Sequence, residues 1–411
     1  MPQNWQSGKL GNFIIFQRGF DLPEYAREPG SIPVVTSSGI SGYHSTAKVE
    51  GPGIVIGRYG TLGEVFYIKE GFWPHNTSLY VKDFKGNEPH FILYFLKTVN
   101  YQSHNDKSSV PGLNRNHLHL VDVVVPPLHE QRAIAHVLGS LDDKIELNRK
   151  MNATLEELAR AIFKSWFVDF DPVRAKAAGR QPVGMDDATA ALFPDSFETV
   201  DGREVPRGWE IQAFDKSIEI ISGGTPKTTI AEYWNGNIPW FSVVDSPTHS
   251  DVFVIDTQKK ITQLGLEKSP AKVLPAGITI ITARGTVGKV AITGVPLAIN
   301  QSCYGVKGQE KRGAYFTYFA LRYLVDDLKR MTHGAVFDTI TRETFTILKN
   351  PQVPIELTQS YDNQVAHLLI QIKLNQELSQ TLAKLRDSLL PKLLSGEIRV
   401  RDAEHWIETV S

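Results

Sequence analysis

The chain has 411 residues, a length that normally divides into two or three domains, and its 41% hydrophobic and 22% charged residues are ordinary for a globular protein. A net charge of −1 excludes a uniformly basic protein that coats nucleic acid, so any contact with nucleic acid must be local. The single cysteine, Cys303, excludes a disulfide framework and a cysteine-based zinc site, and the lack of a signal peptide or a long apolar run predicts a cytoplasmic protein without membrane contact.

Residues 1–128 are predicted to form a first globular domain of mixed α and β structure. Short apolar runs between glycine-rich turns are typical of strands, and a longer apolar stretch of helical period follows them. The predicted elements are the strands Phe13–Phe16, Gly53–Ile56, Val65–Ile68 and Leu79–Val81 and the helix His90–Val99.

Residues 129–167 are predicted to form one long helix. From Ile134 to Trp166 the seam positions, mostly apolar, recur at alternating steps of four and three, which is the pattern of a coiled coil. A helix with one narrow apolar stripe is not stable alone, so it needs a partner helix.

Residues 168–205 are predicted to be a linker. The stretch contains Pro172, Pro182 and Pro194, scattered glycines and many acidic residues, a composition typical of connecting segments. It would separate the first long helix from a second globular domain.

Residues 206–354 are predicted to form this second domain, again with mixed α and β structure. The same pattern of short apolar runs, glycine turns and one helical stretch is found here. The predicted elements are the strands Ile218–Ile221, Ile278–Ile281, Val290–Ile292 and Tyr304–Val306 and the helix Tyr315–Leu328.

Residues 355–396 are predicted to form the partner helix, followed by a short acidic tail, 397–411. A second seam of the same spacing begins at Tyr361 and ends at Leu393. Asn148 and Asn375 occupy the same position of the two seams, which two unrelated amphipathic helices would not reproduce. A polar residue in an apolar seam commonly fixes the register of the two helices.

The duplication extends into the globular domains. Tyr59–Val65 has the sequence YGTLGEV, and Arg284–Val290 has the sequence RGTVGKV. Pro2–Trp5 opens the chain, and Pro206–Trp209 opens its second half in the same way. The order of segments is therefore domain, helix, linker, domain, helix, which indicates an α+β fold with an internal repeat.

No catalytic motif is found in the sequence. Gly285–Lys289 has the wrong spacing for a phosphate-binding loop, and Val125–Leu128 and Asn350–Val353 both fail the Asp/Asn-Pro-Pro-aromatic pattern of DNA amino-methyltransferases. Four histidines could serve as metal ligands by residue type but lack cysteines or clustered carboxylates beside them: His117, His119, His129 and His136. The sequence therefore predicts neither catalysis nor a metal site.

The repeated glycine turns, Gly60–Gly63 and Gly285–Gly288, are either structural hairpins or loops that touch a phosphate backbone, and the sequence leaves both open. Around them lie side chains that suit base edges and phosphates. The candidate DNA-binding residues are Arg58, Thr61, Lys107, Asn114, Arg115 and Asn116 in the first half, and Lys227, Thr228, Arg284, Thr286, Lys289, Thr341 and Arg342 in the second.

Three motifs carry a resemblance to a known family. They are Pro127–Ile134 (PLHEQRAI), Leu141–Asn148 (LDDKIELN) and Leu158–Val173 (LARAIFKSWFVDFDPV). They closely resemble the central conserved region of type I restriction-modification specificity subunits, and the layout of the whole chain is similar to that family. The second helix departs from the pattern at Thr358–Tyr361, where TQSY stands in place of Glu-Gln-x-x-Ile.

The resemblance implies two target-recognition domains at opposite ends of an antiparallel pair of long helices, related by a pseudo-twofold axis. Each domain would read a few base pairs of double-stranded DNA, mostly in the major groove, and the helices would set the distance between two different half-sites. The chain would hold no cofactor. Two methyltransferase subunits, docked on the helices and the adjoining domain faces, would bind S-adenosylmethionine, and restriction subunits would use ATP and Mg²⁺.

Two other functions remain open at this point. One is the recognition subunit of a related system that cuts DNA on both sides of its site. The other is a coiled-coil scaffold with two ligand-binding domains that do not bind DNA; it predicts no binding to duplex DNA with or without partner proteins.

Overall fold

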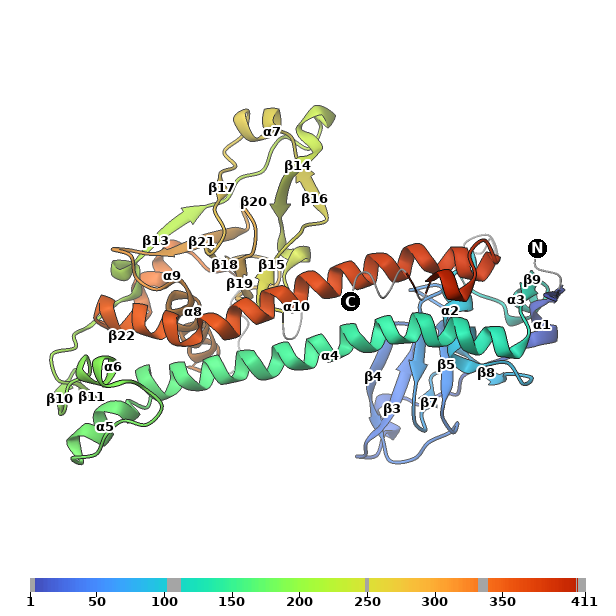
Figure 1. Ribbon diagram of the computed structural model, residues 1–411, viewed down its shortest axis with the longest axis horizontal. Coiled ribbons are helices and arrows are strands. Elements are labelled where there is room, and N and C mark those ends of the chain that lie inside the picture. The colour runs from blue at the N-terminus through green and yellow to red at the C-terminus, as the bar shows by residue number, and fades with distance from the viewer. Residues whose placement is uncertain (1–3, 102–111, 248–250, 332–338, 404, 406–411) are drawn as a thin grey trace. The chain divides into compact units, whose positions relative to one another are not determined.

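The computed structural model describes all residues except 1–3, 102–111, 248–250, 332–338, 404 and 406–411 (Figure 1). The chain forms two compact units. Unit 1 consists of Met1–Ile145 and Thr381–Ser411, and unit 2 consists of Glu146–Gln380. Each unit contains a β-rich region and a part of each of two long helices, α4 (Leu128–Phe167) and α10 (Ile355–Ser395).

The two long helices pack against each other and are antiparallel within unit 2. There the Tyr361 hydroxyl donates to the carbonyl of Ala159 (2.9 Å), while Asn152, earlier in α4, meets Asn375, later in α10. Within unit 1 the guanidinium of Arg386 is paired with the carboxylate of Asp142. The α+β class and the pairing of the long helices, which the heptad spacing predicts, are confirmed.

Asparagines occupy the middle of the seam, as the sequence predicts. Asn148, Asn152 and Asn375 are all buried. The Asn375 amide donates to Asn152 Oδ1 (2.9 Å), and the Asn148 amide donates to Ser379 Oγ (3.1 Å). Because each of these buried amides finds a partner at this one alignment, they favour one register over its neighbours.

In its described residues, the β-rich region of unit 1 has three sheets. β1 pairs with β9, the second sheet has the order β2-β8-β5-β6, and the third has the order β4-β3-β7. Three short helices accompany them, and their apolar faces share one core with the unit 1 parts of α4 and α10. The bounds are β1 (Gln6–Lys9), α1 (Leu10–Phe13), β2 (Ile15–Arg18), β3 (Ile32–Thr36), β4 (Gly39–His44), β5 (Gly53–Gly57), β6 (Val65–Ile68), β7 (Trp73–Pro74), β8 (Ser78–Asp83), α2 (Pro89–Lys97), α3 (Arg115–His119) and β9 (Asp122–Val125).

The β-rich region of unit 2 repeats these sheets and adds strands to them. Its strand orders are β12-β22, β13-β21-β18-β19-β15 and β16-β14-β20-β17, with a separate hairpin β10-β11. The bounds are α5 (Asp171–Ala177), α6 (Asp187–Ala191), β10 (Phe197–Val200), β11 (Arg203–Pro206), β12 (Ile211–Ala213), β13 (Ile218–Ser222), β14 (Trp234–Phe241), β15 (Phe253–Val254), β16 (Lys259–Ile261), α7 (Gln263–Glu267), β17 (Val273–Leu274), β18 (Thr279–Thr282), β19 (Val290–Thr293), β20 (Leu297–Ile299), β21 (Cys303–Gly308), α8 (Ala314–Met331), α9 (Arg342–Ile347) and β22 (Lys349–Pro351).

Matching strand orders support the duplication that the sequence indicates. The order β2-β8-β5-β6 in unit 1 corresponds to β13-β21-β18-β19 in unit 2, and the pairing of β1 with β9 corresponds to that of β12 with β22. The parallel pair β3-β7 likewise corresponds to the parallel pair β14-β20. Strands β15 and β17 are additions at the edges of the unit 2 sheets.

The stretch 168–205, predicted as a linker, is folded. It forms α5, α6 and the hairpin β10-β11, and Phe170, Val173 and Phe193 are buried in the core of unit 2. Trp166, at the end of α4, packs edge-on against Phe193 with ring centroids 5.5 Å apart. The apolar residues are too widely spaced for a periodic signal, so the prolines and acids dominated the sequence-based prediction.

Most predicted strands are found, with one correction. The runs at 53–56, 65–68 and 79–81 lie in β5, β6 and β8, and the four runs of the second half coincide with β13, β18, β19 and β21, with β18 beginning one residue later than predicted. The predicted strand Phe13–Phe16 is wrong at its start, because residues 10–13 form the helical turn α1 and β2 begins at Ile15. Leu10 and Phe13 are three residues apart and both are buried, which a helical turn allows.

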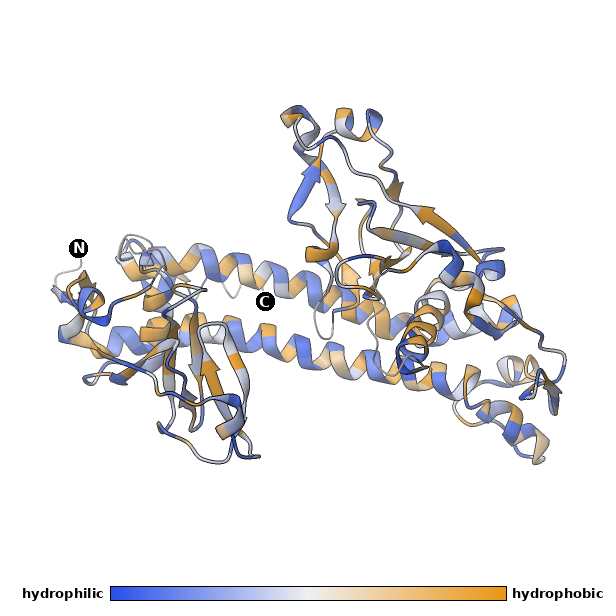
Figure 2. Ribbon diagram, turned by 180° about the vertical axis from the view of Figure 1, so that it is seen from behind, coloured by the Kyte–Doolittle hydropathy of each residue, from blue (hydrophilic) through white to orange (hydrophobic). Residues whose placement is uncertain are grey.

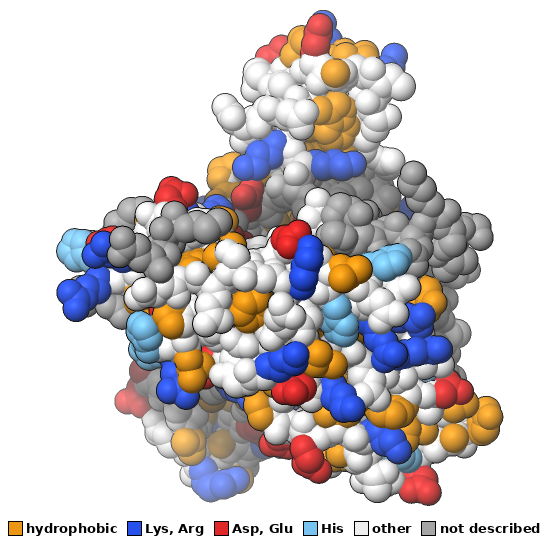
Figure 3. Space-filling view, turned by 90° about the vertical axis from the view of Figure 1, so that its right-hand side faces the viewer, with side chains coloured by type: hydrophobic (Ala, Val, Ile, Leu, Met, Phe, Trp, Pro, Cys, Tyr) orange, Lys and Arg blue, Asp and Glu red, His pale blue; other side chains and the backbone are white. Residues whose placement is uncertain are grey.

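The surface of the helices alternates in polarity. Apolar and polar residues succeed one another along both long helices, as expected of helices that bury one stripe (Figure 2). In the face drawn in Figure 3, Lys and Arg side chains are interspersed with acidic, apolar and uncharged ones. Among the described residues, no helix combines the length and the apolar character needed to cross a membrane.

Candidate nucleic-acid interface

The first glycine turn connects β5 to β6 in unit 1. Gly57 N donates to the carbonyl of Glu64 (3.0 Å), and Gly63 N donates to the carbonyl of Gly57 (3.2 Å). Gly60 and Gly63 have φ values of 75° and 76°, a conformation that other residues rarely adopt. The glycines therefore have a structural role, and they present Thr61 to solvent at the tip of the hairpin.

The second glycine turn, between β18 and β19 in unit 2, has the same hydrogen bonds. Thr282 N donates to the carbonyl of Lys289 (3.0 Å), and Gly288 N donates to the carbonyl of Thr282 (2.9 Å). Gly285 and Gly288 have φ values of 79° and 77°. The two turns are thus the same hairpin loop, built once in each unit.

In unit 1, several candidate residues meet beside this hairpin. The N–H of Leu113 donates to the carbonyl of Arg58 (3.0 Å), which places Asn114 and α3 next to the hairpin. The Arg58 guanidinium lies over the ring of Tyr59, 4.4 Å from its centroid, a cation–π contact that holds its plane. Asn114 is the N-cap of α3 and accepts from Asn116 N (3.0 Å), so its side chain has a structural role.

A cavity of about 550 Å³ opens between these segments. Arg18, at the end of β2, Arg58 and Arg115 line it, and among the described side chains around it none is acidic. We call these three arginines and the space between them the arginine pocket. Sequence analysis missed Arg18, although a basic residue that ends an apolar strand just before a glycine, Gly19, was a visible signal.

The histidine at the end of α3 adds no charge here. His119 Nε2 accepts from Phe16 N (2.9 Å). Burial lowers the pKa of His119, and the charges of Arg115 and Lys85 lower it further, so the imidazole is neutral near pH 7. Across the described part of the chain, no group of three or more His, Cys, Asp or Glu could hold a metal ion.

Four candidates of the first half remain, of which the structure describes three. Thr61, Arg115 and Asn116 are exposed. Lys107 lies outside the described residues.

In unit 2, the matching segments meet in the matching way. The N–H of Ile340 donates to the carbonyl of Ala283 (2.9 Å), the counterpart of the bond between Leu113 and Arg58. Thr341 is the N-cap of α9, and its backbone N–H donates to Thr344 Oγ1 (3.0 Å). Thr341 and Asn114 therefore cap corresponding helices, and their presence in both halves has a structural explanation.

Arg342, the residue that follows this cap, is hydrogen-bonded to β13. Arg342 Nη2 donates to the carbonyl of Ile220 (3.0 Å) and to Ser222 Oγ (3.1 Å), both on β13. Both arginines are exposed, but Arg284 lies at the tip of the hairpin, at the position that Tyr59 occupies in unit 1. Of the two arginines, Arg284 is the better placed to meet a ligand.

The remaining candidates of the second half lie around the same edge. Thr286 and Lys289 are exposed on the hairpin with Arg284. Lys227 and Thr228 are exposed on the segment that leads from β13 to β14, and Trp234 Nε1 donates to the carbonyl of Lys227 (3.2 Å). The structure therefore brings together Arg284, Thr286, Thr341 and Arg342 and leaves Lys227 and Thr228 on a neighbouring segment.

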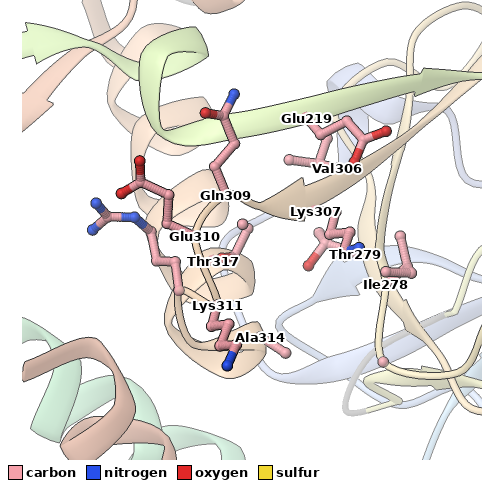
Figure 4. Close-up of a pocket in the computed structure, with 13 residues that line it drawn as sticks. Glu219, Ile278, Thr279, Val306, Lys307, Gln309, Glu310, Lys311, Ala314 and Thr317 are labelled. Carbon is pink, nitrogen blue, oxygen red and sulfur yellow. The ribbon is translucent and has the colours of Figure 1, made fainter. Parts of the chain in front are cut away.

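A second cavity, of about 510 Å³, lies on the sheet β13-β21-β18-β19-β15, at the end opposite the glycine hairpin (Figure 4). Glu219 on β13 and Lys307 on β21 line it, together with Glu310 and Lys311 from the loop before α8. Thr279 is buried beside them, and its hydroxyl has no hydrogen-bond partner among the described residues. Charges of both signs line this cavity, so it has no preference for a polyanion.

Comparison with known proteins places the chain in a family. The sequence model of the family described as "Type I restriction modification DNA specificity domain" matches residues 2–157 and 206–384. The HindI specificity subunit of Haemophilus influenzae is 30% identical over 315 residues, covering 67% of this chain and 68% of that one. The MjaIX specificity subunit of Methanocaldococcus jannaschii is 27% identical over 324 residues, covering 76% and 69%.

The fold is also known from a solved structure. The crystal structure of the type I restriction-modification S subunit from M. genitalium has a TM-score of 0.55 and 16% sequence identity, and the match covers 95% of this chain and 96% of that one. The family model matches both halves of the chain, in agreement with the glycine hairpin that is found once in each unit. The chain therefore belongs to the specificity subunits of type I restriction-modification systems, the non-catalytic subunits that confer recognition of the DNA target.

Proposed function

We propose that each unit reads one half of a bipartite, asymmetric DNA site with its hairpin edge. By hairpin edge we mean the glycine hairpin together with the capped helix beside it, α3 in unit 1 and α9 in unit 2. One observation carries this proposal: the two edges have the same backbone hydrogen bonds and different exposed side chains. A common scaffold with Tyr59 in one copy and Arg284 in the other is expected of two readers with different targets. The DNA contacts of the thirteen candidate residues are part of this proposal.

We further propose that α4 and α10 dock two methyltransferase subunits. The unit 2 parts of both helices carry large apolar side chains that point to solvent, at spacings of four or seven residues. They are Leu147, Met151 and Leu158 on α4 and Ile370, Leu374 and Leu378 on α10, all between 37% and 57% exposed. Such stripes suit the apolar face of a partner helix.

The proposed assembly divides the chemistry between its subunits. The methyltransferase subunits would bind S-adenosylmethionine, and restriction subunits would use ATP and Mg²⁺. This chain would recognise the target sequence on the DNA. Because the target is the cell's DNA, the complex would work in the cytoplasm.

A mobility-shift assay tests the DNA-binding proposal. The target is first identified by mapping methylated adenines in the genome of the source organism. The purified chain with its methyltransferase subunits is then titrated against a duplex with that target and against an unrelated duplex. We expect the target to bind at least about 10³-fold more tightly, the usual lower bound for specific binding. Equal affinity for both duplexes would contradict the proposal.

The spacing function of the helices needs its own test. One heptad inserted after Asn148 and one after Asn375 keep both seams in phase and lengthen each helix by about 10 Å. Since duplex DNA rises about 3.4 Å per base pair, the best spacer should grow by about three base pairs. Binding to duplexes whose spacer varies by single base pairs measures this. An optimum that stays at the original spacer would mean that the helices do not measure the site.

A further inference from the structure

The arginine pocket of unit 1 gathers three positive charges around one open space. Arg18 comes from β2, Arg58 follows β5, and Arg115 begins α3, so three separate segments converge on it. None of the described side chains that line the cavity is acidic. Like charges in a shared concavity repel one another, and the repulsion is relieved when an anion enters.

The atoms of the pocket are held in place but are not all satisfied. The Tyr59 ring orients the Arg58 guanidinium, and Arg18 Nε donates to the carbonyl of Asn76 (3.4 Å). Arg58 Nη1 is buried and has no hydrogen-bond partner among the described residues. Native proteins rarely leave a buried donor of a charged group unpaired, so this atom indicates a missing acceptor.

We propose that the arginine pocket binds a phosphate group of the DNA backbone, an inference that rests on the proposed function of unit 1 as a DNA reader. The alternative ligand is a guanine edge. A guanine edge is neutral and engages one guanidinium through two acceptors, which would leave two like charges without a counterion. A phosphate carries the negative charge and offers several acceptor oxygens to more than one guanidinium.

The described residues of unit 2 do not repeat this set of arginines, which makes the assignment specific to unit 1. Ala283 stands where unit 1 has Arg58, as the matching bonds from Ile340 and Leu113 show. The Nη2 atom of Arg342, the counterpart of Arg115, donates to the Ile220 carbonyl and to Ser222 Oγ. The two halves of the chain therefore hold the DNA differently, and unit 1 carries this sequence-independent contact.

The salt dependence of DNA binding tests the pocket. Arg58→Gln and Arg115→Gln are compared with the wild type in the complex with methyltransferase subunits, on target and unrelated duplexes. Losing one phosphate contact should shallow the slope of log K against log salt by about 0.9 and weaken binding about five-fold at 0.15 M salt. The loss should be the same on both duplexes. Lys69→Gln, an exposed charge beyond the far end of β6, is the matched control and should leave the slope unchanged.

The possible results separate the two proposals. A wild type that does not prefer the target refutes the proposed function. A wild type that prefers it, with variants that lose preference at one base pair and keep the salt slope, overturns the phosphate assignment in favour of a guanine edge. Unchanged binding in both variants, with melting temperatures that show they are folded, overturns it as well.

A second measurement distinguishes a DNA phosphate from free phosphate. Inorganic phosphate is titrated into the chain alone while its melting temperature is followed. We expect little stabilisation below millimolar phosphate, because the pocket is matched to one diester among many on a duplex. Strong stabilisation that Arg58→Gln abolishes, combined with an unchanged DNA salt slope, would assign the pocket to a free phosphate ion and overturn the proposal.

Discussion

The hairpin edges of unit 1 and unit 2 have one backbone and two sets of side chains. In both, the residue before the hairpin loop bonds its counterpart across the turn, and a capped helix follows next to it. The side chains at matching places are unlike: Arg58 against Ala283, and Tyr59 against Arg284. A scaffold fixed by backbone bonds and glycines leaves these positions free to vary, so a change of target need not disturb the fold.

The same comparison explains where the second helix departs from the family pattern. In unit 1, Gln131 near the start of α4 accepts from Glu88 N (2.9 Å), just before α2. In unit 2, Thr358 near the start of α10 accepts from Gly313 N (3.1 Å), just before α8. Threonine therefore replaces glutamine in the same anchoring task. The two units keep the bond and change the side chain that makes it.

Exchange of the first domain should have the largest effect. Replacing residues 1–128 with the matching segment of another family member should change one half-site completely and leave the other unchanged. Methylation mapping of the hybrid complex measures this. The donor should keep an acceptor for Gln131, because its amide donates to Asn87 Oδ1 (2.7 Å) inside the exchanged segment. A hybrid that alters both half-sites would show that the units are not independent readers.

Alanine at the hairpin glycines should separate conformational strain from packing. Gly63 has a positive φ, and an added Cβ would lie 2.3 Å from the Tyr101 ring, so Gly63→Ala should lower the free energy of unfolding by about 3–4 kcal/mol. Gly288→Ala meets Val325 at 3.0 Å and should cost about 2 kcal/mol.

Gly60→Ala is the control for these two variants. Gly60 has φ of 75°, and an added Cβ meets nothing within 4 Å, so only the backbone strain remains, about 1 kcal/mol. Denaturant unfolding measures all three. Equal losses at Gly60 and Gly63 would show that the ring of Tyr101 moves aside.

The two arginines of the unit 2 edge should differ on DNA. Arg284→Ala should weaken binding by about 1–3 kcal/mol and relax preference at one base pair if the guanidinium meets a guanine. Arg342→Ala should weaken binding less, because this side chain is committed to Ile220 and Ser222. Affinities for duplexes with single base-pair changes test this. A larger loss at Arg342 would mean that its bonds to β13 orient it toward the DNA.

Sequence was sufficient where the determining pattern is local. The seam from Ile134 to Trp166 depends on spacing along one helix, and its residues are buried or half-buried as expected. The glycine turns were recognisable because two copies of a short motif need the same positive φ values. The helix pair also followed from the repeat, since each seam requires a partner.

Sequence was insufficient where partners are distant in the chain. Nothing near Arg342 reveals that it is bonded to Ile220, more than a hundred residues earlier. Nothing near Arg18 reveals that Arg115 will lie across a cavity from it. Asn114 and Thr341 were candidates for base contacts because of their residue type, and their positions as helix caps emerge only with the fold.

The units should also differ in their response to pH, through one carboxylate. In unit 2 an acid near the start of α10 caps the helix that packs on it: Asp362 accepts from Tyr315 N (3.1 Å) and Phe316 N (2.8 Å) at the start of α8. Burial raises the pKa of Asp362 to about 6, and the backbone N–H donors oppose this rise only in part. In unit 1 the side chain that anchors the start of α4 to the segment before α2 is Gln131, which cannot titrate.

A raised carboxyl pKa means that the folded state holds a proton which the unfolded state has released. The free energy of unfolding should therefore fall as pH rises from about 4 to about 6.5, and no further above that range. After discounting for partial exposure, we expect a loss of about 1–2 kcal/mol. Denaturant unfolding of wild type and Asp362→Asn across this range isolates the contribution of Asp362, with the exposed Asp201→Asn as control. Parallel curves for wild type and Asp362→Asn would show that the carboxyl is ionised in the folded state throughout, held so by its two backbone donors.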